Sequence, residues 1–173
     1  WTASMPAAEA RDEADWSTSS TLAHLRSRSA IASSFSFSAA SLRDAAVRQT
    51  VEQFLTSLRT VLSESGRTYC VIAGAELAHL GMRYGDKAPP TDFSFHRAMQ
   101  HDLEMLKPVE ELKPEEFAAY IQKEHDQRRI SGFSPIYSLL QLIQAEKGQV
   151  LRYDRGITDQ YNSTVTYASM AFF

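Results

Sequence analysis

The sequence has little cysteine, few glycines and no long apolar run, and each absence excludes a class of protein. One cysteine, Cys70, permits neither an internal disulfide nor a cysteine-based zinc cluster. A single cysteine fits a reducing intracellular compartment or a virion better than secretion. The glycines of "GAELAHLG" stand too far apart to wrap a phosphate. No apolar stretch approaches the roughly 20 residues of a membrane span, so we expect no membrane partner.

The length and composition of the chain are typical of one globular domain. The chain has 173 residues, of which 43% are hydrophobic and 23% charged. A chain of this length buries about 70% of its unfolded surface when it folds. The net charge of −3 excludes a uniformly basic nucleic-acid-binding protein but leaves room for a local basic patch.

Residues 1–40 differ in composition from the remainder of the chain. From residue 17 onward this segment is rich in serine and alanine and contains two arginines and no acid. Serine at this density favours turns and helix caps over helix interiors. We therefore predict a Ser-rich arm that lies along a surface, with a short helix near residues 18–28. The alternative is an ordinary first helix of a bundle.

Helical periodicity and boundary residues then predict a series of helices. The clearest follows Ser41, where apolar residues recur at helical spacing until Gly66. Thr91 begins another, which Pro108 ends, and Pro114 and Pro135 each stand in a first helical turn. Residues 69–82 fit a buried strand or a helix, and their apolar stripe favours a helix. The predicted helices cover about residues 42–65, 69–82, 91–107, 114–129 and 134–147.

After Gly148 the helical period disappears, and valine, threonine and tyrosine in near alternation predict an extended segment. The predicted fold class is therefore mostly α. It is a helical bundle of four to six helices with a Ser-rich N-terminal arm and an extended C-terminal tail. The corresponding divisions are residues 1–40, 41–150 and 151–173.

No group of residues forms a recognisable catalytic or metal site. His96 and His101 are five residues apart, about 140° around a helix, and match no zinc signature. Cys70 has no glycine elbow and no base at a known spacing. We expect no catalytic residue, no metal and no cofactor, and we predict that the chain is not an enzyme. A small enzyme that uses Cys70 or the His96 and His101 pair is the least favoured alternative.

Charge is distributed unevenly along the chain. Residues 101–126 carry eight acids and three lysines, and residues 128–155 carry five bases and two acids. Acidic and basic faces of this kind suit the head-to-tail packing of identical copies. A second basic stretch supports the alternative of a nucleic-acid-binding module, which would use Arg26, Arg28, Arg43 and Arg48.

The uncharged C-terminal tail favours a role in assembly. Each of its large apolar side chains would gain about 1.5–3 kcal/mol on burial, and we find no second strand long enough to pair with it. A neighbouring subunit offers both burial and strand pairing. We interpret the chain as a non-enzymatic structural or assembly subunit, coat-like, nucleocapsid-like or accessory. Its predicted partners are copies of itself or other protein subunits, with RNA as a further partner. The predicted assembly residues are Val165, Tyr167, Met170, Phe172 and Phe173.

Overall fold

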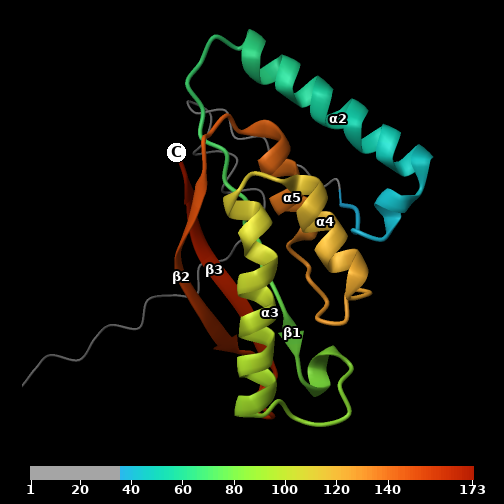
Figure 1. Cartoon of the computed structure of the whole chain (residues 1–173), viewed down its shortest axis with the longest axis vertical. Coiled ribbons are helices and arrows are strands. Elements are labelled where there is room, and N and C mark those ends of the chain that lie inside the picture. Colours follow the sequence, from blue (N-terminus) through green and yellow to red (C-terminus); the bar gives the residue numbers. More distant parts are fainter. Residues whose placement is uncertain (1–35) are drawn as a thin grey trace, which may run out of the picture. The chain divides into compact units, whose positions relative to one another are not determined.

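Helices and a small sheet share residues 36–173, the part of the chain that the computed structural model describes (Figure 1). The predicted helical bundle is wrong, because four α-helices in this part pack with a three-stranded antiparallel sheet. Most of the predicted arm, with its short helix, Arg26 and Arg28, lies outside the described residues. The helices are α2 (Ala45–Glu64), α3 (Asp92–Glu110), α4 (Pro114–Lys123) and α5 (Phe133–Leu142), with short 3-10 turns η1 (Ser41–Arg43) and η2 (Met82–Tyr84). The strands are β1 (His79–Leu80), β2 (Gly148–Ile157) and β3 (Thr164–Phe172).

The predicted free tail, residues 151–173, contains most of β2 and all of β3, and β3 is the central strand of the sheet. The strand order is β1-β3-β2, and β3 pairs with β2 from Gly148 opposite Phe172 to Ile157 opposite Thr164. A register shift between Val150 and Arg152 interrupts the alternation of β2, and exposed charged residues further weaken its strand pattern. For this reason the sequence pattern did not show that the tail contains two strands that pair with each other.

The tail residues predicted for assembly take part in the fold of their own chain. Val165 is 5% exposed, and Met170 and Phe172 pack against the core cluster. Tyr167 and Phe173 keep about half of their surface exposed, at 44% and 55%. Because burial and strand pairing both come from the same chain, the tail is not evidence for a neighbouring subunit.

Four of the five predicted helices are confirmed, although α4 ends at Lys123 and α5 at Leu142, before the predicted ends at residues 129 and 147. α2 begins at Asp44 rather than at Ser41, because Asp44 Oδ1 accepts hydrogen bonds from the backbone of Ala46 (2.8 Å) and Val47 (3.4 Å). α3 begins at a reciprocal Thr91 and Ser94 capping box, as Thr91 predicted, but continues past Pro108 to Glu110. A proline in the last turn removes few helical hydrogen bonds, so the helix tolerates it.

Residues 69–82 do not form the predicted helix. Their second half is extended and lies between two other segments of backbone. Thr166 of β3 exchanges backbone hydrogen bonds with Leu77 (2.8 Å) and Ala78 (2.9 Å) on one side. On the other side, His79 N donates to Arg128 O at 2.8 Å and Gly132 N donates to Glu76 O at 2.8 Å. Pairing with residues far away in the chain outweighs the helical stripe here.

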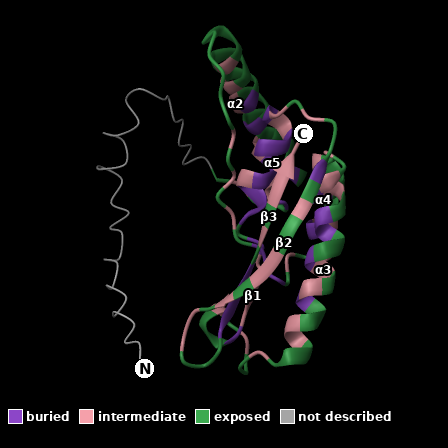
Figure 2. Cartoon of the chain, turned by 90° about the vertical axis from the view of Figure 1, so that its left-hand side faces the viewer, coloured by how far each residue is buried: buried purple, intermediate pink, exposed green. Residues whose placement is uncertain are grey.

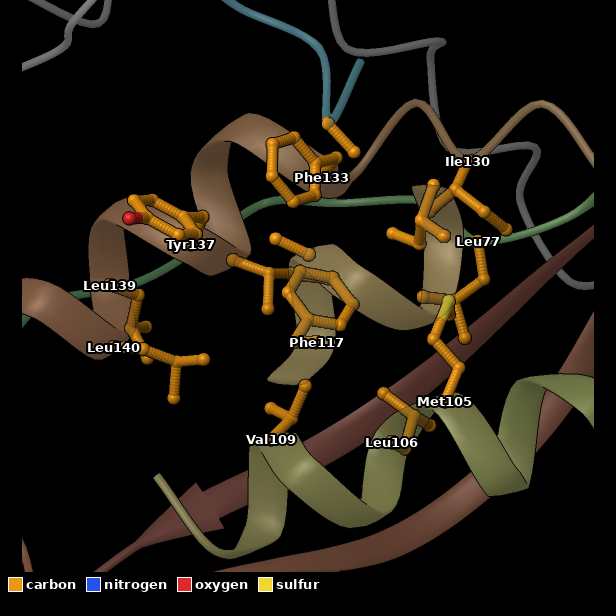
Figure 3. Packing of buried hydrophobic residues seen from close by; sticks show 14 of the residues in the cluster. Leu77, Met105, Leu106, Val109, Phe117, Ile130, Phe133, Tyr137, Leu139 and Leu140 are labelled. Atoms are coloured by element: carbon orange, nitrogen blue, oxygen red, sulfur yellow. The ribbon is translucent and has the colours of Figure 1, made fainter. Parts of the chain in front are cut away.

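The core lies where α3, α4 and α5 meet the sheet. Figure 3 shows Phe117 of α4 among side chains of α3 and α5, and its ring stacks on Phe133 at 5.5 Å between centroids. Figure 2 shows that α2 is exposed along most of its length, and Val51 and Leu55 are its buried residues. None of the helices among residues 36–173 is long and apolar enough to cross a membrane.

The central position of β3 predicts the effect of removing it. Deletion of residues 164–173 should abolish cooperative unfolding and reduce helical circular dichroism, because it removes the strand that joins β1 to β2. The matched control is Tyr167→Thr, which changes an exposed side chain of the same strand and should alter stability by about 1 kcal/mol or less. A truncated protein with intact dichroism and a sharp urea transition would contradict this role.

Candidate functional site

A buried carboxylate joins four parts of the fold. Asp102 on α3 is 0% exposed and pairs with the Arg128 guanidinium from the α4–α5 connection. Its Oδ2 atom accepts hydrogen bonds from the Tyr153 hydroxyl on β2 (2.7 Å) and the Thr166 hydroxyl on β3 (2.6 Å). Thr166 Oγ1 also accepts from the backbone N–H of Ala78 at 2.8 Å. A single side chain therefore holds α3 against both long strands and against the α4–α5 connection.

The electrostatics of this network keep its hydroxyls protonated. Burial raises the pKa of the Asp102 carboxyl, while the Arg128 guanidinium and the hydroxyl donors act in the opposite direction. Burial, and then the Asp102 carboxylate, raise the pKa of Tyr153 far above its usual range. Tyr153 therefore keeps its proton, and its hydroxyl donates a hydrogen bond to Asp102 Oδ2.

The other side of Arg128 forms one wall of a groove. Its Nη2 and Nε atoms lie 2.9 Å and 3.0 Å from Glu124 Oε2, and its guanidinium lies 5.9 Å from the centre of the Tyr120 ring. These contacts and Asp102 hold the side chain, which belongs to a residue only 8% exposed. The position of Arg128 is thus determined before any ligand arrives.

The groove has a volume of about 340 Å³ and lies between α3, the C-terminal end of α4 and β1. Leu80 and Ala98 give it apolar surface, and Phe93, which is 78% exposed, stands at its edge. Its charged groups include more bases than acids. The residues that line it are Leu80, Phe93, Ser94, Arg97, Ala98, His101, Lys123, Glu124, Gln127 and Arg128.

A histidine in the groove wall contacts one side-chain oxygen of α4 and one of the residue that caps the C-terminus of α4. His101 Nδ1 lies 3.2 Å from the Tyr120 hydroxyl and 3.3 Å from Glu124 Oε1. The Tyr120 hydroxyl donates to Glu104 Oε2 at 3.0 Å, and burial together with Glu104 raises the pKa of Tyr120 well above its usual range. Glu124 Oε1 is a buried side-chain oxygen without a hydrogen-bond partner among the described residues.

A second histidine, at β1, belongs to a separate cluster. The side chain of His79 is 12% exposed, and its ring nitrogens lie 3.1 Å from Leu77 O and 3.1 Å from Glu76 Oε2. The edge of its ring meets Tyr84 at 4.8 Å between centroids. One histidine and one carboxylate are thus in direct contact here.

Of the residues predicted to be functional that lie within residues 36–173, only His101 lines the groove. His96 is exposed and contacts Asp92 O at 2.7 Å, and Cys70 is exposed in the extended segment before β1. Arg43 reaches Gln122 O at 3.4 Å, and Arg48 holds Leu42 O at 2.8 Å and 3.1 Å, so both are engaged within the fold.

The sequence pattern did not predict a buried network at Asp102 or a groove lined by Arg97, Lys123 and Arg128. Arg97 and His101 are four residues apart on a confirmed helix. This spacing places them on one face, so the sequence could have indicated that the two side chains lie together. Nothing local connects them to Lys123 and Arg128, which lie in or after a different helix.

Comparison with known protein families places the chain in one of them. The profile of the family described as Memo-like protein matches residues 42–171, a range that runs from η1 to the end of β3. The chain belongs to the Memo-like family. This family is related to extradiol dioxygenase-like enzymes. No curated protein matches the chain.

Membership in this family corrects the interpretation of the chain as an assembly subunit. Neither the family nor the α/β fold supports a coat-like, nucleocapsid-like or accessory subunit, or the nucleic-acid-binding alternative. The absence of catalysis and the predicted protein and RNA partners remain predictions.

The relationship to dioxygenase-like enzymes raises the question of an iron site. Non-haem iron oxygenases hold their metal with two histidines and one carboxylate. Among residues 36–173 no group of three histidine, cysteine, aspartate or glutamate side chains is arranged to hold a metal ion. His79 and Glu76 supply one ligand of each kind and contact each other directly. The described residues therefore do not supply this ligand set.

The buried network predicts a large loss of stability when its carboxylate is removed. Asp102→Ala should lower the free energy of unfolding by about 3–5 kcal/mol, because Arg128, Tyr153 and Thr166 would all lose their shared buried partner. The control is Asp154→Ala, which breaks an exposed pair with Arg152 (2.7 Å) and should cost about 1 kcal/mol or less. Urea unfolding would measure both. Equal losses in the two variants would show that Asp102 has no special role.

Proposed function

We propose that this chain is a non-catalytic ligand-binding protein that takes a small organic molecule into the groove. The observation that carries the proposal is the groove itself, about 340 Å³ with both apolar and charged walls. Sites for small molecules usually have volumes of about 300–1,000 Å³ and combine apolar surface with a few converging polar groups. The groove meets both conditions.

The rigidity of one wall supports binding. Asp102 and Glu124 hold Arg128 from opposite sides, and the backbone of Arg128 accepts a hydrogen bond from His79 N at 2.8 Å. The next residue, Arg129, pairs with Asp86 at 2.7 Å. A wall that is already ordered loses little conformational entropy when a ligand binds, which increases affinity.

The chemistry of the groove favours binding over catalysis. Among the lining residues, Ser94 is the one with a hydroxyl group. This hydroxyl donates a hydrogen bond to Thr91 O at 2.8 Å as part of the helix cap. A hydroxyl that completes a cap is poorly placed to act as a nucleophile, which needs a neighbouring base. Cys70 lies outside the lining residues.

Phe93 gives the groove an edge suited to an aromatic ligand. Phe93 is 78% exposed and lines the groove together with the apolar residues Leu80 and Ala98. An aromatic group lying in the groove would cover the Phe93 ring, and aromatic pairs contribute about 0.5–1.5 kcal/mol beyond the burial of their area. The ligand that fits best therefore has an aromatic or similar flat apolar part.

Nuclear magnetic resonance with benzoate and benzyl alcohol as probes tests this proposal. Amide shifts should cluster at groove residues for at least one probe, and Phe93→Ala should weaken binding by about 2- to 10-fold. Phe173→Ala is the control, because Phe173 is also exposed but lies outside the groove. Shifts scattered over other surfaces, or affinities that Phe93→Ala leaves unchanged, would refute binding in the groove.

A further inference from the structure

The groove carries positive charge that the protein does not neutralise. Arg128 pairs with two acids, Asp102 and Glu124, so its own charge is fully used within the fold. Arg97 and Lys123 also line the groove, and among the described residues neither has an ion-pair or hydrogen-bond partner. Two unmatched bases beside a cavity attract a ligand of negative charge. Arginine in particular presents paired donors that fit carboxylate or phosphate oxygens.

The third group that decides the charge of the groove is His101. The Tyr120 proton is directed to Glu104, so His101 Nδ1 faces two acceptor oxygens, those of Tyr120 and Glu124. A neutral imidazole has one N–H, and these contacts favour its position on Nδ1. Nε2 is then an acceptor with no partner among the described residues, on a side chain that is 40% exposed in the groove wall.

An anion in the groove changes this balance. A lone pair on Nε2 repels an incoming oxyanion, whereas a proton there makes Nε2 a charged donor. The resulting imidazolium also brings positive charge within 3.3 Å of the buried Glu124 Oε1, which otherwise lacks a hydrogen-bond partner in the described part. Both changes favour protonation when the ligand is bound.

We infer that the ligand of the groove is an organic oxyanion, a carboxylate or phosphate, and that its binding takes up a proton on His101. This inference rests on the function proposed for the groove. The charged and titratable groups around His101 come from α3, from α4 and from the connection that follows it. Those that oppose protonation are Arg97, Lys123 and Arg128, and those that favour it are Glu104, acting through Tyr120, and Glu124.

Isothermal titration calorimetry of the unaltered protein with benzoate and benzyl alcohol tests the inference. Benzoate remains ionised from pH 5.5 to pH 8, so a change in its affinity over this range reports on the protein. We expect benzoate to bind about tenfold more weakly at the upper end of the range, as His101 loses its proton. Benzyl alcohol, a neutral molecule of similar shape, should show no such change. Phenyl phosphate, compared with benzoate at one pH, identifies the preferred head group.

Three variants identify the groups responsible. His101→Gln should remove the pH dependence of benzoate binding, whereas His96→Gln, which changes an exposed histidine on the same helix, should preserve it. Arg97→Gln should weaken benzoate binding at every pH and leave benzyl alcohol unaffected. In the unaltered protein, titrations in two buffers of different ionisation heat should show net proton uptake with benzoate near neutral pH.

The possible failures are distinguishable. If neither probe binds, the proposed function fails and the inference fails with it. If benzyl alcohol binds as tightly as benzoate, or if benzoate binding is independent of pH and releases no buffer-dependent heat, the groove binds ligands but the inference is wrong. Persistence of the pH dependence in His101→Gln would also overturn the assignment to His101.

Discussion

The contact on which the described fold depends most is the one between the buried Asp102 carboxylate and its three donors. A helix, two strands and the α4–α5 connection meet at this single side chain. A charge this deep is unfavourable unless every partner stays in place, because removal of any one leaves a desolvated polar group. The network therefore fixes the position of α3 against the sheet.

The same network connects the fold to the groove. Asp102 and Glu124 both form ion pairs with the Arg128 guanidinium and together determine its position. Because these two acids already neutralise Arg128, the charge open to a ligand resides on the longer, more exposed side chains of Arg97 and Lys123. A rigid wall and an adaptable charged edge are a combination that suits small ligands.

Kinship with dioxygenase-like enzymes does not by itself determine what this chain does. Related proteins often keep a fold while the site changes. Here the described residues lack a three-ligand metal group, and the groove has no activated nucleophile among the contacts of its hydroxyl residue. The pairing of His101 with Glu124 and Tyr120 is better explained as control of charge at a binding site than as part of a metal centre.

Much of the helical structure was predictable from the sequence, because helix signals act over three or four residues. The periodicity of α2, the Thr91 cap of α3 and Pro114 at the start of α4 are all local, and each helix formed where they predicted.

The sheet and the site were decided by tertiary structure, since their contacts join residues far apart in the chain. The sequence predicts a helix over residues 69–82 because no nearby residue indicates that residues 164–166 will pair with residues 77–80. The tail is predicted to be free because its first part, which is most of β2, has an interrupted strand pattern and gives no local sign that it pairs with β3. Asp102 has the sequence context of any surface acid on a helix. Only the approach of Arg128, Tyr153 and Thr166 makes its burial possible, and those residues lie 26 to 64 positions away.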